Sequence, residues 1–192
     1  MNSFILGVGF AVGKVILSMM AAYAIVYFRF RLGVVFFWMI FTPLLLPLEV
    51  RILPSYEVMT KLGLVNTYTG LIVPLLASAT GTFYFRQFFK SVPDELLEAA
   101  RIDGAGPFKF FFDILVPLSK TMIAAIFIIM FVYGWNQYLW PMLMTNEEGF
   151  YTLVRGIKQI LLVWVGSQIP EYNQAFALAI LAMLPPVLIV VI

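Results

Sequence analysis

Long apolar segments dominate this sequence and limit what it can fold into. A helix needs about 20 mainly apolar residues to cross the hydrocarbon core of a bilayer. Five segments have that length, and they are residues 4–28, 32–53, 68–89, 122–144 and 173–192. Because backbone polar groups in lipid must be satisfied internally, such segments form helices. The sequence therefore predicts an all-α, polytopic membrane helix bundle with about five spans.

The third of these segments is less regular than the others. Pro74 interrupts it, and Ser78, Thr80 and Thr82 are polar. Polar groups and broken backbone are tolerated at membrane depth only where they face protein or a water-filled cavity. We expect this side of the segment to face the interior of the bundle.

Composition excludes several classes of protein. Of the 192 residues, 62% are hydrophobic and 11% charged, whereas soluble domains carry about 25% charged residues. Cysteine and histidine are absent, so disulfides, thiolate metal sites and Ser-His-Asp or Cys-His nucleophiles are excluded. The basic residues form no patch for nucleic acid. We expect no enzymatic chemistry, no cofactor and no metal in this chain.

The positions of Lys and Arg predict the orientation of the bundle, because cytoplasmic loops are enriched in both. One side of the membrane collects seven of them: Arg29, Arg31, Arg86, Lys90, Arg101, Lys109 and Lys120. The other side holds four: Arg51, Lys61, Arg155 and Lys158. The loop at 90–120 is therefore expected in the cytoplasm, and the loops at 54–67 and 145–172 outside.

The cytoplasmic loop contains the signals of a short helix with defined ends. Ser91 or Val92 is expected to cap it, Pro93 suits its first turn, and Gly104 supplies a left-handed stop. A second short helix should begin at Pro107.

The faces of this helix allow two interpretations. At about 100° per residue, the charged side chains of Asp94, Glu98 and Arg101 form one stripe. Ile102 falls on that charged side. The opposite stripe is Leu96, Leu97, Ala99 and Ala100. The helix either lies along the inner membrane surface or docks into a pocket of a partner protein.

A spaced motif in this loop resembles a known signature. Glu98-Ala99-Ala100 is followed, after three residues, by Gly104. Nine residues then separate Gly104 from Ile114, and one residue separates Ile114 from Val116-Pro117. This pattern is similar to the signature loop of ATP-binding-cassette (ABC) importer permeases, although valine stands where leucine usually precedes the proline. The resemblance implies that residues 91–117 form a coupling-helix loop that docks on an ATPase. The expected docking residues are Glu98, Ala99, Ala100, Arg101, Ile102, Asp103 and Gly104.

The resemblance extends over nearly the whole chain. Residues 85–89 and 134–141 are similar to the carbohydrate-uptake, maltose-type group of these permeases. Residues 37–41, 46–52 and 77–80 resemble the branch that imports sn-glycerol-3-phosphate. The resemblance implies a type I ABC importer transmembrane domain over residues 1–192. Since such permeases carry six spans, we expect this chain to be truncated at both ends.

The resemblance also implies partners. They are a cytoplasmic ATPase dimer that binds and hydrolyses ATP, a second homologous permease subunit and a periplasmic solute-binding protein, all serving a small-molecule substrate at the bacterial inner membrane. The expected cargo is sn-glycerol-3-phosphate or a related phosphodiester, and another sugar or polyol is the alternative. An ion-coupled secondary transporter fits less well, because the span cores contain no Asp or Glu to relay ions.

Lys14 is an unusual residue for its position. It lies ten residues beyond Phe4, which is about 15 Å of helix rise and places it near the midplane of the bilayer. A lysine at that depth cannot bring its charge to the interface. Its ammonium is expected to face either a structural partner or a cavity, where it would anchor an anionic substrate.

Two further features are candidates for function. Asn136 and Gln137 need polar partners in the fourth span, through interhelical hydrogen bonds or by lining the substrate pathway. The loop at 145–172, with Glu147 and Glu148, resembles the loop of maltose-type importers that probes the cleft of the binding protein, and the resemblance implies the same role. A simple solvated loop is the alternative.

Overall fold

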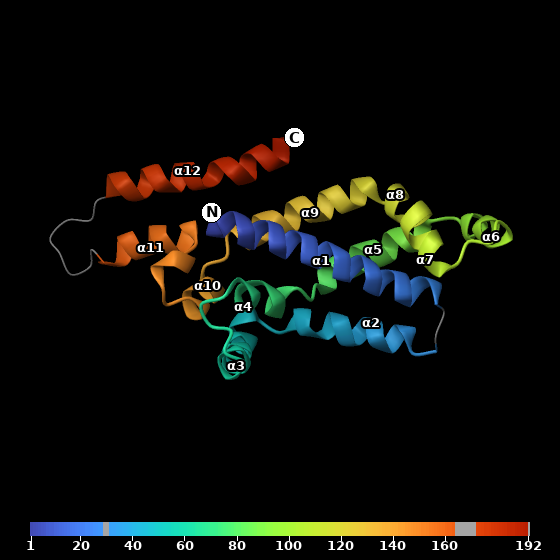
Figure 1. Cartoon of the computed structure of the whole chain (residues 1–192), viewed down its shortest axis with the longest axis horizontal. Coiled ribbons are helices and arrows are strands. Elements are labelled where there is room, and N and C mark those ends of the chain that lie inside the picture. Colours follow the sequence, from blue (N-terminus) through green and yellow to red (C-terminus); the bar gives the residue numbers. More distant parts are fainter. Residues whose placement is uncertain (29–30, 164–171, 192) are drawn as a thin grey trace. The chain divides into compact units, whose positions relative to one another are not determined.

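The computed structural model describes residues 1–28, 31–163 and 172–191, and these residues contain helices and connecting turns but no strand. Figure 1 shows the helices, coloured along the chain. Arg29, one of the basic residues used to predict the orientation, lies outside the described residues. Ile192, the end of the last predicted span, lies outside them as well. The α-helices are α1 (Asn2–Tyr27), α2 (Gly33–Phe41), α3 (Leu48–Lys61), α4 (Tyr68–Ile72), α5 (Ala79–Ser91), α6 (Asp94–Ile102), α7 (Pro107–Lys109), α8 (Val116–Leu118), α9 (Lys120–Trp135), α10 (Leu139–Met144), α11 (Leu153–Val163) and α12 (Tyr172–Val191). Short turns of other helix types are η1 (Thr42–Leu45), η2 (Val73–Leu75), the π-helical η3 (Phe110–Leu115) and η4 (Glu148–Phe150).

The all-α architecture is confirmed, but three of the expected spans are not continuous helices. Among the described residues, α1 and Asn173–Val191 of α12 are each long and apolar enough to cross a membrane alone. The pair Pro107–Leu118 and Lys120–Trp135 passes the same test only as a span bent by 74°. The expected spans at 32–53, 68–89 and 122–144 are all interrupted.

Each interruption has a local cause. Pro47 follows Leu46, whose extended backbone (φ −87°, ψ 127°) is the conformation that a following proline favours. Ser78 restarts the third segment as the N-cap of α5, accepting a hydrogen bond from Gly81 N at 3.2 Å. Pro141 lies in the first turn of α10, where a proline is tolerated, so α9 and α10 are separate helices.

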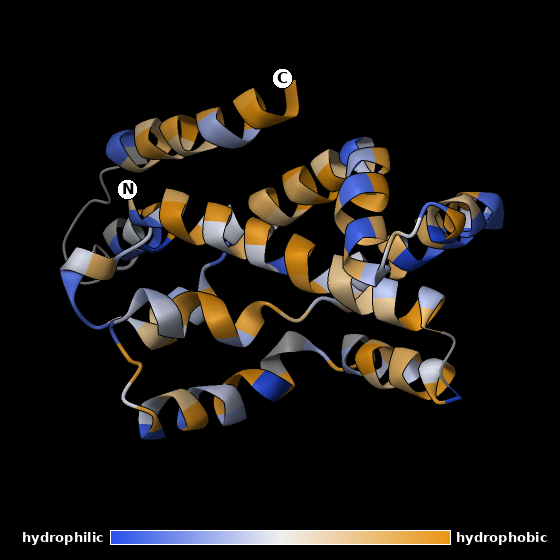
Figure 2. Cartoon of the chain, turned by 45° about the vertical axis from the view of Figure 1, so that its right-hand side comes forward, coloured by the Kyte–Doolittle hydropathy of each residue, from blue (hydrophilic) through white to orange (hydrophobic). Residues whose placement is uncertain are grey.

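The contacts divide the chain into two compact units. Unit 1 comprises Met1–Ala11, Leu48–Leu76 and Ile128–Ile192. Unit 2 comprises Val12–Pro47 and Ala77–Phe127. Figure 2 shows that apolar residues predominate along α1, α9 and α12, whereas α6 mixes hydrophilic and hydrophobic residues. This contrast separates the apolar spans from the short loop helix.

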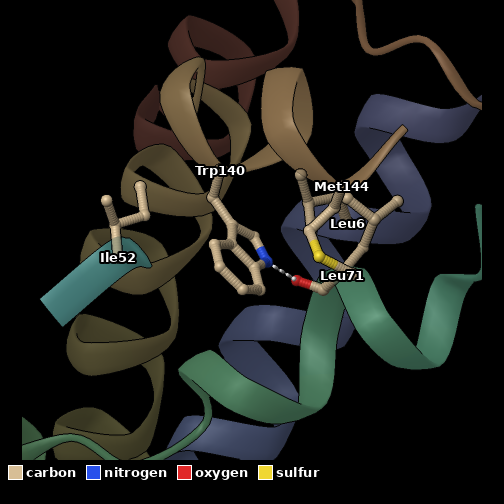
Figure 3. Packing of buried hydrophobic residues seen from close by; sticks show 5 residues of the cluster. All are labelled: Leu6, Ile52, Leu71, Trp140 and Met144. Carbon is tan, nitrogen blue, oxygen red and sulfur yellow. Dashed lines mark hydrogen bonds between the residues drawn. The ribbon is translucent and has the colours of Figure 1, made fainter. Parts of the chain in front are cut away.

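The core of unit 1 forms around a buried tryptophan. Trp140 packs in a cluster with Leu6, Ile52, Leu71 and Met144 (Figure 3). Its indole N–H donates to Leu71 O at 3.1 Å, which satisfies the polar atom of a side chain that is 1% exposed. The cluster therefore joins α1, α3, α4 and α10.

Unit 2 packs the later part of α1 against α5. The Ser18 hydroxyl donates to Ser78 O at 3.3 Å, and a Cβ at Gly81 would lie 2.5 Å from Ser18 Oγ. Ser78 and Thr82 are buried, and Thr80 is half-buried. The expectation that the polar side of this segment faces protein is thus confirmed.

Candidate functional site

The loop between α5 and α8 is centred on α6, whose C-terminal end is rigidly closed. Gly104 has φ +74°, a left-handed conformation that glycine adopts without a Cβ penalty. Its N–H donates to Arg101 O at 3.1 Å, and Ala105 N donates to Ala100 O at 2.8 Å. These two bonds form a Schellman motif, which confirms the predicted stop at Gly104. The predicted start of a second helix at Pro107 is confirmed as α7.

The predicted N-cap of this helix, Ser91 or Val92, is wrong by two residues or one. Pro93 is itself the N-cap of α6, with extended backbone and no side-chain capping bond, and the helix begins at Asp94. Val92 ends α5. The Ser91 hydroxyl donates back to Phe88 O at 2.7 Å, within the last turn of α5. Ser91 is therefore the last residue of α5, and Pro93 rather than Ser91 caps α6.

The charged stripe of α6 and Ile102 are exposed, as helical periodicity predicted, but the opposite stripe is divided between buried and exposed residues. Ala100 is 4% exposed and Leu97 is half-buried, so this side packs within unit 2. Ala99 lies on the exposed side, and Ile102 is 86% exposed. We call the exposed side the outer face of α6, and its residues are Glu95, Glu98, Ala99 and Ile102. An isoleucine that remains almost fully exposed on an ordered helix is suited to a partner surface.

Two tyrosines of α1 hold the loop in place. The Tyr23 hydroxyl donates to Pro107 O at 2.9 Å, and the Tyr27 hydroxyl to Phe89 O at 3.4 Å. The ring of Tyr23 lies 4.9 Å from that of Phe111, and the ring of Tyr27 lies 5.3 Å from that of Phe110. The loop is thus fixed to the last two turns of α1 by hydrogen bonds and aromatic contacts together.

Sequence reasoning missed both tyrosines. The available signal was their spacing of four residues at the end of the first span, which places them on one side of a helix. The run of phenylalanines at 110–112 was a second signal, because aromatic pairs contribute about 0.5–1.5 kcal/mol beyond the area that they bury.

The segment after α6 has the same division into an inner and an outer side. Phe110 and Phe111 are 1% and 8% exposed, whereas Phe108 is 81% exposed. The π-helical turn η3 widens the helix at this point and leads to α8, where Pro117 occupies an early position that tolerates proline. Phe108 and Ile102 are the two most exposed large apolar side chains of this loop.

Lys14 lies on the buried side of α1, at 9% exposed. Val15, Ser18 and Ala22, which share that side of the helix within unit 2, are also buried. The lysine is therefore surrounded by protein groups and does not point into lipid, as its depth predicted. Either a structural or a substrate-binding role is compatible with this position.

The two polar residues of the fourth segment differ from each other. Asn136 is exposed, and its side-chain amide donates to Val132 O of its own helix at 2.9 Å, so the expected interhelical bond is not the one found. Gln137 is buried at 8% exposed, in the break between α9 and α10. Both residues belong to unit 1 and Lys14 to unit 2, so the structure does not place the three as one site.

The beginning of α1 bonds to the segment that was expected outside. Asn2 Nδ2 donates to Gly149 O at 2.6 Å and to Tyr151 O at 3.1 Å, and Asn2 Oδ1 accepts from the Tyr68 hydroxyl at 2.8 Å. Ser3 Oγ accepts from Leu153 N at 2.6 Å. Residues 149–153 are thus held against α1 within unit 1.

A second set of bonds orders the residues that precede and follow residues 149–153. The Asn66 side chain accepts from Asn146 N at 2.6 Å and donates to Glu147 at 3.3 Å. Arg155 donates to Pro141 O at 3.1 Å and to Thr145, and its guanidinium lies 3.8 Å from the Tyr151 ring centroid. Residues 145–163 therefore have a defined conformation, although residues 146–149 are exposed, and residues 164–171 lie outside the described part.

Comparisons with known proteins agree with this architecture. Residues 14–192 match the family described as the binding-protein-dependent transport system inner membrane component. The sn-glycerol-3-phosphate transport system permease protein UgpE of Brucella melitensis is 56% identical over 191 residues, which is 100% of this chain and 67% of that protein. The protein of the same name from Pectobacterium atrosepticum is 54% identical over 192 residues, covering 100% of this chain and 68% of that protein.

A solved structure shares the fold. It is the crystal structure of a bacterial ABC transporter involved in the import of the acidic polysaccharide alginate, with a TM-score of 0.84 over 98% of this chain and 70% of that chain. The sequence identity is 23%, so this likeness shows the fold alone. Together with the family match, it identifies the chain as a member of the inner membrane components of binding-protein-dependent transport systems, the permease subunits of ABC importers.

Proposed function

We propose that this permease subunit moves sn-glycerol-3-phosphate, or a related phosphodiester, across the bacterial inner membrane with ATP hydrolysed by a partner subunit. The observation that carries the proposal is an identity of 56% to a permease of that name across the whole chain. The role requires a pathway and a docking surface but no cofactor in this chain. A permease for another sugar or polyol is the second candidate, because Lys14, Asn136 and Gln137 do not separate these cargoes.

The outer face of α6 is the proposed contact with a cytoplasmic ATPase dimer. Ile102 supports this assignment, because fully burying an isoleucine side chain contributes about 1.5–3 kcal/mol and this one is 86% exposed. The Schellman closure at Gly104 supports it as well, since a rigid helix loses little conformational entropy on binding. Phe108, at 81% exposed, is a second exposed apolar side chain in the same loop.

The tyrosine contacts give a route from the ATPase to the transport pathway. Closure of the ATPase dimer would move α6, and the bonds of Tyr23 to Pro107 and of Tyr27 to Phe89 would carry that movement to α1. Tyr23 and Lys14 are nine residues apart on one helix, which is about 13 Å of rise. A rigid helix would therefore transmit a displacement of the loop to the buried lysine.

The hydrogen bonds also support the proposed orientation. Within unit 1, the beginning of α1 bonds to residues 149, 151 and 153, all in the loop expected outside. Within unit 2, the end of α1 bonds to residues 89 and 107, at or inside the loop expected in the cytoplasm. We accordingly assign the 145–163 segment to contact with a periplasmic binding protein, and propose a second homologous permease subunit as the other half of the pathway.

Reconstitution of the full-length complex tests the proposal. Purified transporter in proteoliposomes, supplied with its binding protein, should take up labelled sn-glycerol-3-phosphate only when ATP is present on the ATPase side. Binding of the same ligand to the isolated binding protein measures the cargo independently of the permease. Substrate counterflow by this subunit alone, without ATPase or ATP, would instead establish a secondary transporter.

A further inference from the structure

Unit 2 contains a cavity that the transport pathway and the docking face leave unused. It has a volume of about 590 Å³ and lies between the end of α1, the beginning of α2, the end of α5 and the beginning of α6. This volume is within the range of small-ligand pockets, about 300–1,000 Å³. Its lining includes both charged and apolar side chains.

The charged lining is mainly basic. Arg31, Arg86 and Lys90 line the cavity, and Asp94 is the single acidic residue among the lining residues. Three cations against one carboxylate leave an excess of positive charge. A multiply charged anion, such as a phosphate group, is the ligand that this arrangement attracts.

Arg86 has an unsatisfied donor beside this cavity. Its Nε atom is buried and has no hydrogen-bond partner among the described residues. Its guanidinium lies 4.4 Å from the centroid of the Phe37 ring, a cation–π contact that restricts its position. The contact with Phe37 thus holds Arg86 at the cavity, where its positive charge adds to the charges of Arg31 and Lys90.

The apolar lining indicates that the anion carries a hydrocarbon part. Ile25, Val26 and Val34 line one part of the cavity, and Val92 and Leu97 another. Free phosphate would leave these side chains without a partner, whereas a lipid offers apolar groups next to its headgroup. Basic pockets between transmembrane helices on the cytoplasmic side bind the headgroups of anionic lipids.

We propose that this cavity binds the headgroup of an anionic phospholipid from the cytoplasmic leaflet. The proposal rests on the proposed orientation of the 90–120 loop. Because Asp94 and Leu97 of α6 belong to the lining, the bound lipid contacts the coupling helix itself. Occupancy of the cavity steadies the beginning of α6, so ATPase coupling depends on anionic lipid.

The test uses the full-length complex in phosphatidylcholine nanodiscs that contain a minority of phosphatidylglycerol. The phosphatidylglycerol that remains with each complex after detergent extraction is counted by mass spectrometry. Arg31→Gln and Lys90→Gln are the variants, because both side chains are exposed and dispensable for packing. Lys120→Gln is the matched control, an exposed lysine of the same unit that is not among the lining residues.

Each lining cation that is removed should lower phosphatidylglycerol affinity about fivefold. Asp94→Asn should raise it, because that change removes the one negative charge from the lining. Equal retention by the wild type and by a double variant that carries both Arg31→Gln and Lys90→Gln would overturn the proposal. Displacement of the lipid by millimolar inorganic phosphate would also overturn it, in favour of a soluble phosphate ligand. Lipid retention is measured whether or not the ATPase co-purifies. A failure of the docking assignment can therefore be distinguished from a failure of the lipid proposal.

Discussion

The indole N–H of Trp135 in α9 donates to Ala182 O in α12 at a distance of 3.0 Å. In an uninterrupted helix this carbonyl would accept from the residue four positions later, but that residue is Pro186, which has no N–H. Trp135 thus satisfies the carbonyl of Ala182, which Pro186 leaves without a donor. Trp135 and Ala182 are both buried. A tertiary bond of this kind allows α12 to contain a proline at membrane depth.

Trp135→Phe should destabilise the subunit, because it removes the only polar atom of the indole and leaves Ala182 O without this donor. An unsatisfied buried acceptor costs about 1–3 kcal/mol. The thermal unfolding midpoint of the solubilised 192-residue subunit should fall by about 2–4 °C for each kcal/mol lost. Trp38→Phe is the control, since Trp38 is 56% exposed. An equal midpoint for both variants would contradict the assigned bond.

Ile102→Asp should prevent docking without unfolding the subunit, because the side chain is 86% exposed and leaves no cavity behind. Transport should be lost, and less ATPase should co-purify with a permease that still inserts. Gly104→Pro should have the same effect by removing the left-handed closure of α6, since proline cannot adopt φ +74°. Gly106→Ala is the control, because its Cβ would meet nothing within 4 Å. Full ATPase recovery with Ile102→Asp would contradict the docking assignment.

Tyr23→Phe should separate ATP hydrolysis from transport. The change keeps the aromatic contact with Phe111 and removes only the bond to Pro107 O, so the loop should still bind the ATPase while its movement reaches α1 less completely. We expect a several-fold rise in ATP consumed per substrate transported, from a lost bond worth about 1 kcal/mol. Tyr27→Phe, whose bond is longer at 3.4 Å, should have a smaller effect. An unchanged ratio in Tyr23→Phe would exclude this route of coupling.

Local signals in the sequence predicted local structure well. The left-handed glycine at 104 and the helix start at Pro107 depend on neighbours only, and both are confirmed. The length of apolar segments predicted the class of fold but overestimated its regularity. A hydropathy window averages over Pro47 and Ser78, although one proline can end a helix and one capping serine marks where a new helix begins.

The contacts that form the candidate site were not predictable in the same way. Tyr23 and Pro107 are separated by 84 positions, and nothing in either local pattern indicates the other. The apolar stripe of α6 was predicted only in part, for a related reason. Periodicity shows which residues share a side of a helix, but only the packing of unit 2 decides that Ala100 turns inward and Ala99 outward.

Single cysteines test the proposed orientation directly, because the chain has no cysteine of its own. Ser91→Cys and Asn146→Cys introduce thiols at two exposed positions. A membrane-impermeant thiol reagent added outside intact cells should label position 146, and position 91 should react only after the cytoplasmic side is opened. Labelling of position 91 from outside would reverse the orientation and remove the docking proposal with it.

A substitution of Lys14 tests whether the permease binds the anionic end of its substrate. At an effective dielectric constant of ~20, an ammonium and a phosphate oxygen ~4 Å apart attract by ~4 kcal/mol, and desolvation offsets part of this. If Lys14 holds the anionic end of the substrate, Lys14→Met should lower the affinity of phosphate-ester uptake by about one to two factors of ten.

The same change should leave assembly and basal ATP hydrolysis intact, and Lys14→Arg should restore uptake in part, because it returns the charge on a different group. The buried position of Lys14 makes the alternative outcome equally informative. Loss of the assembled complex in Lys14→Met would show that the lysine is a structural contact of the bundle. Normal uptake by Lys14→Met would leave the substrate assignment supported by sequence identity alone.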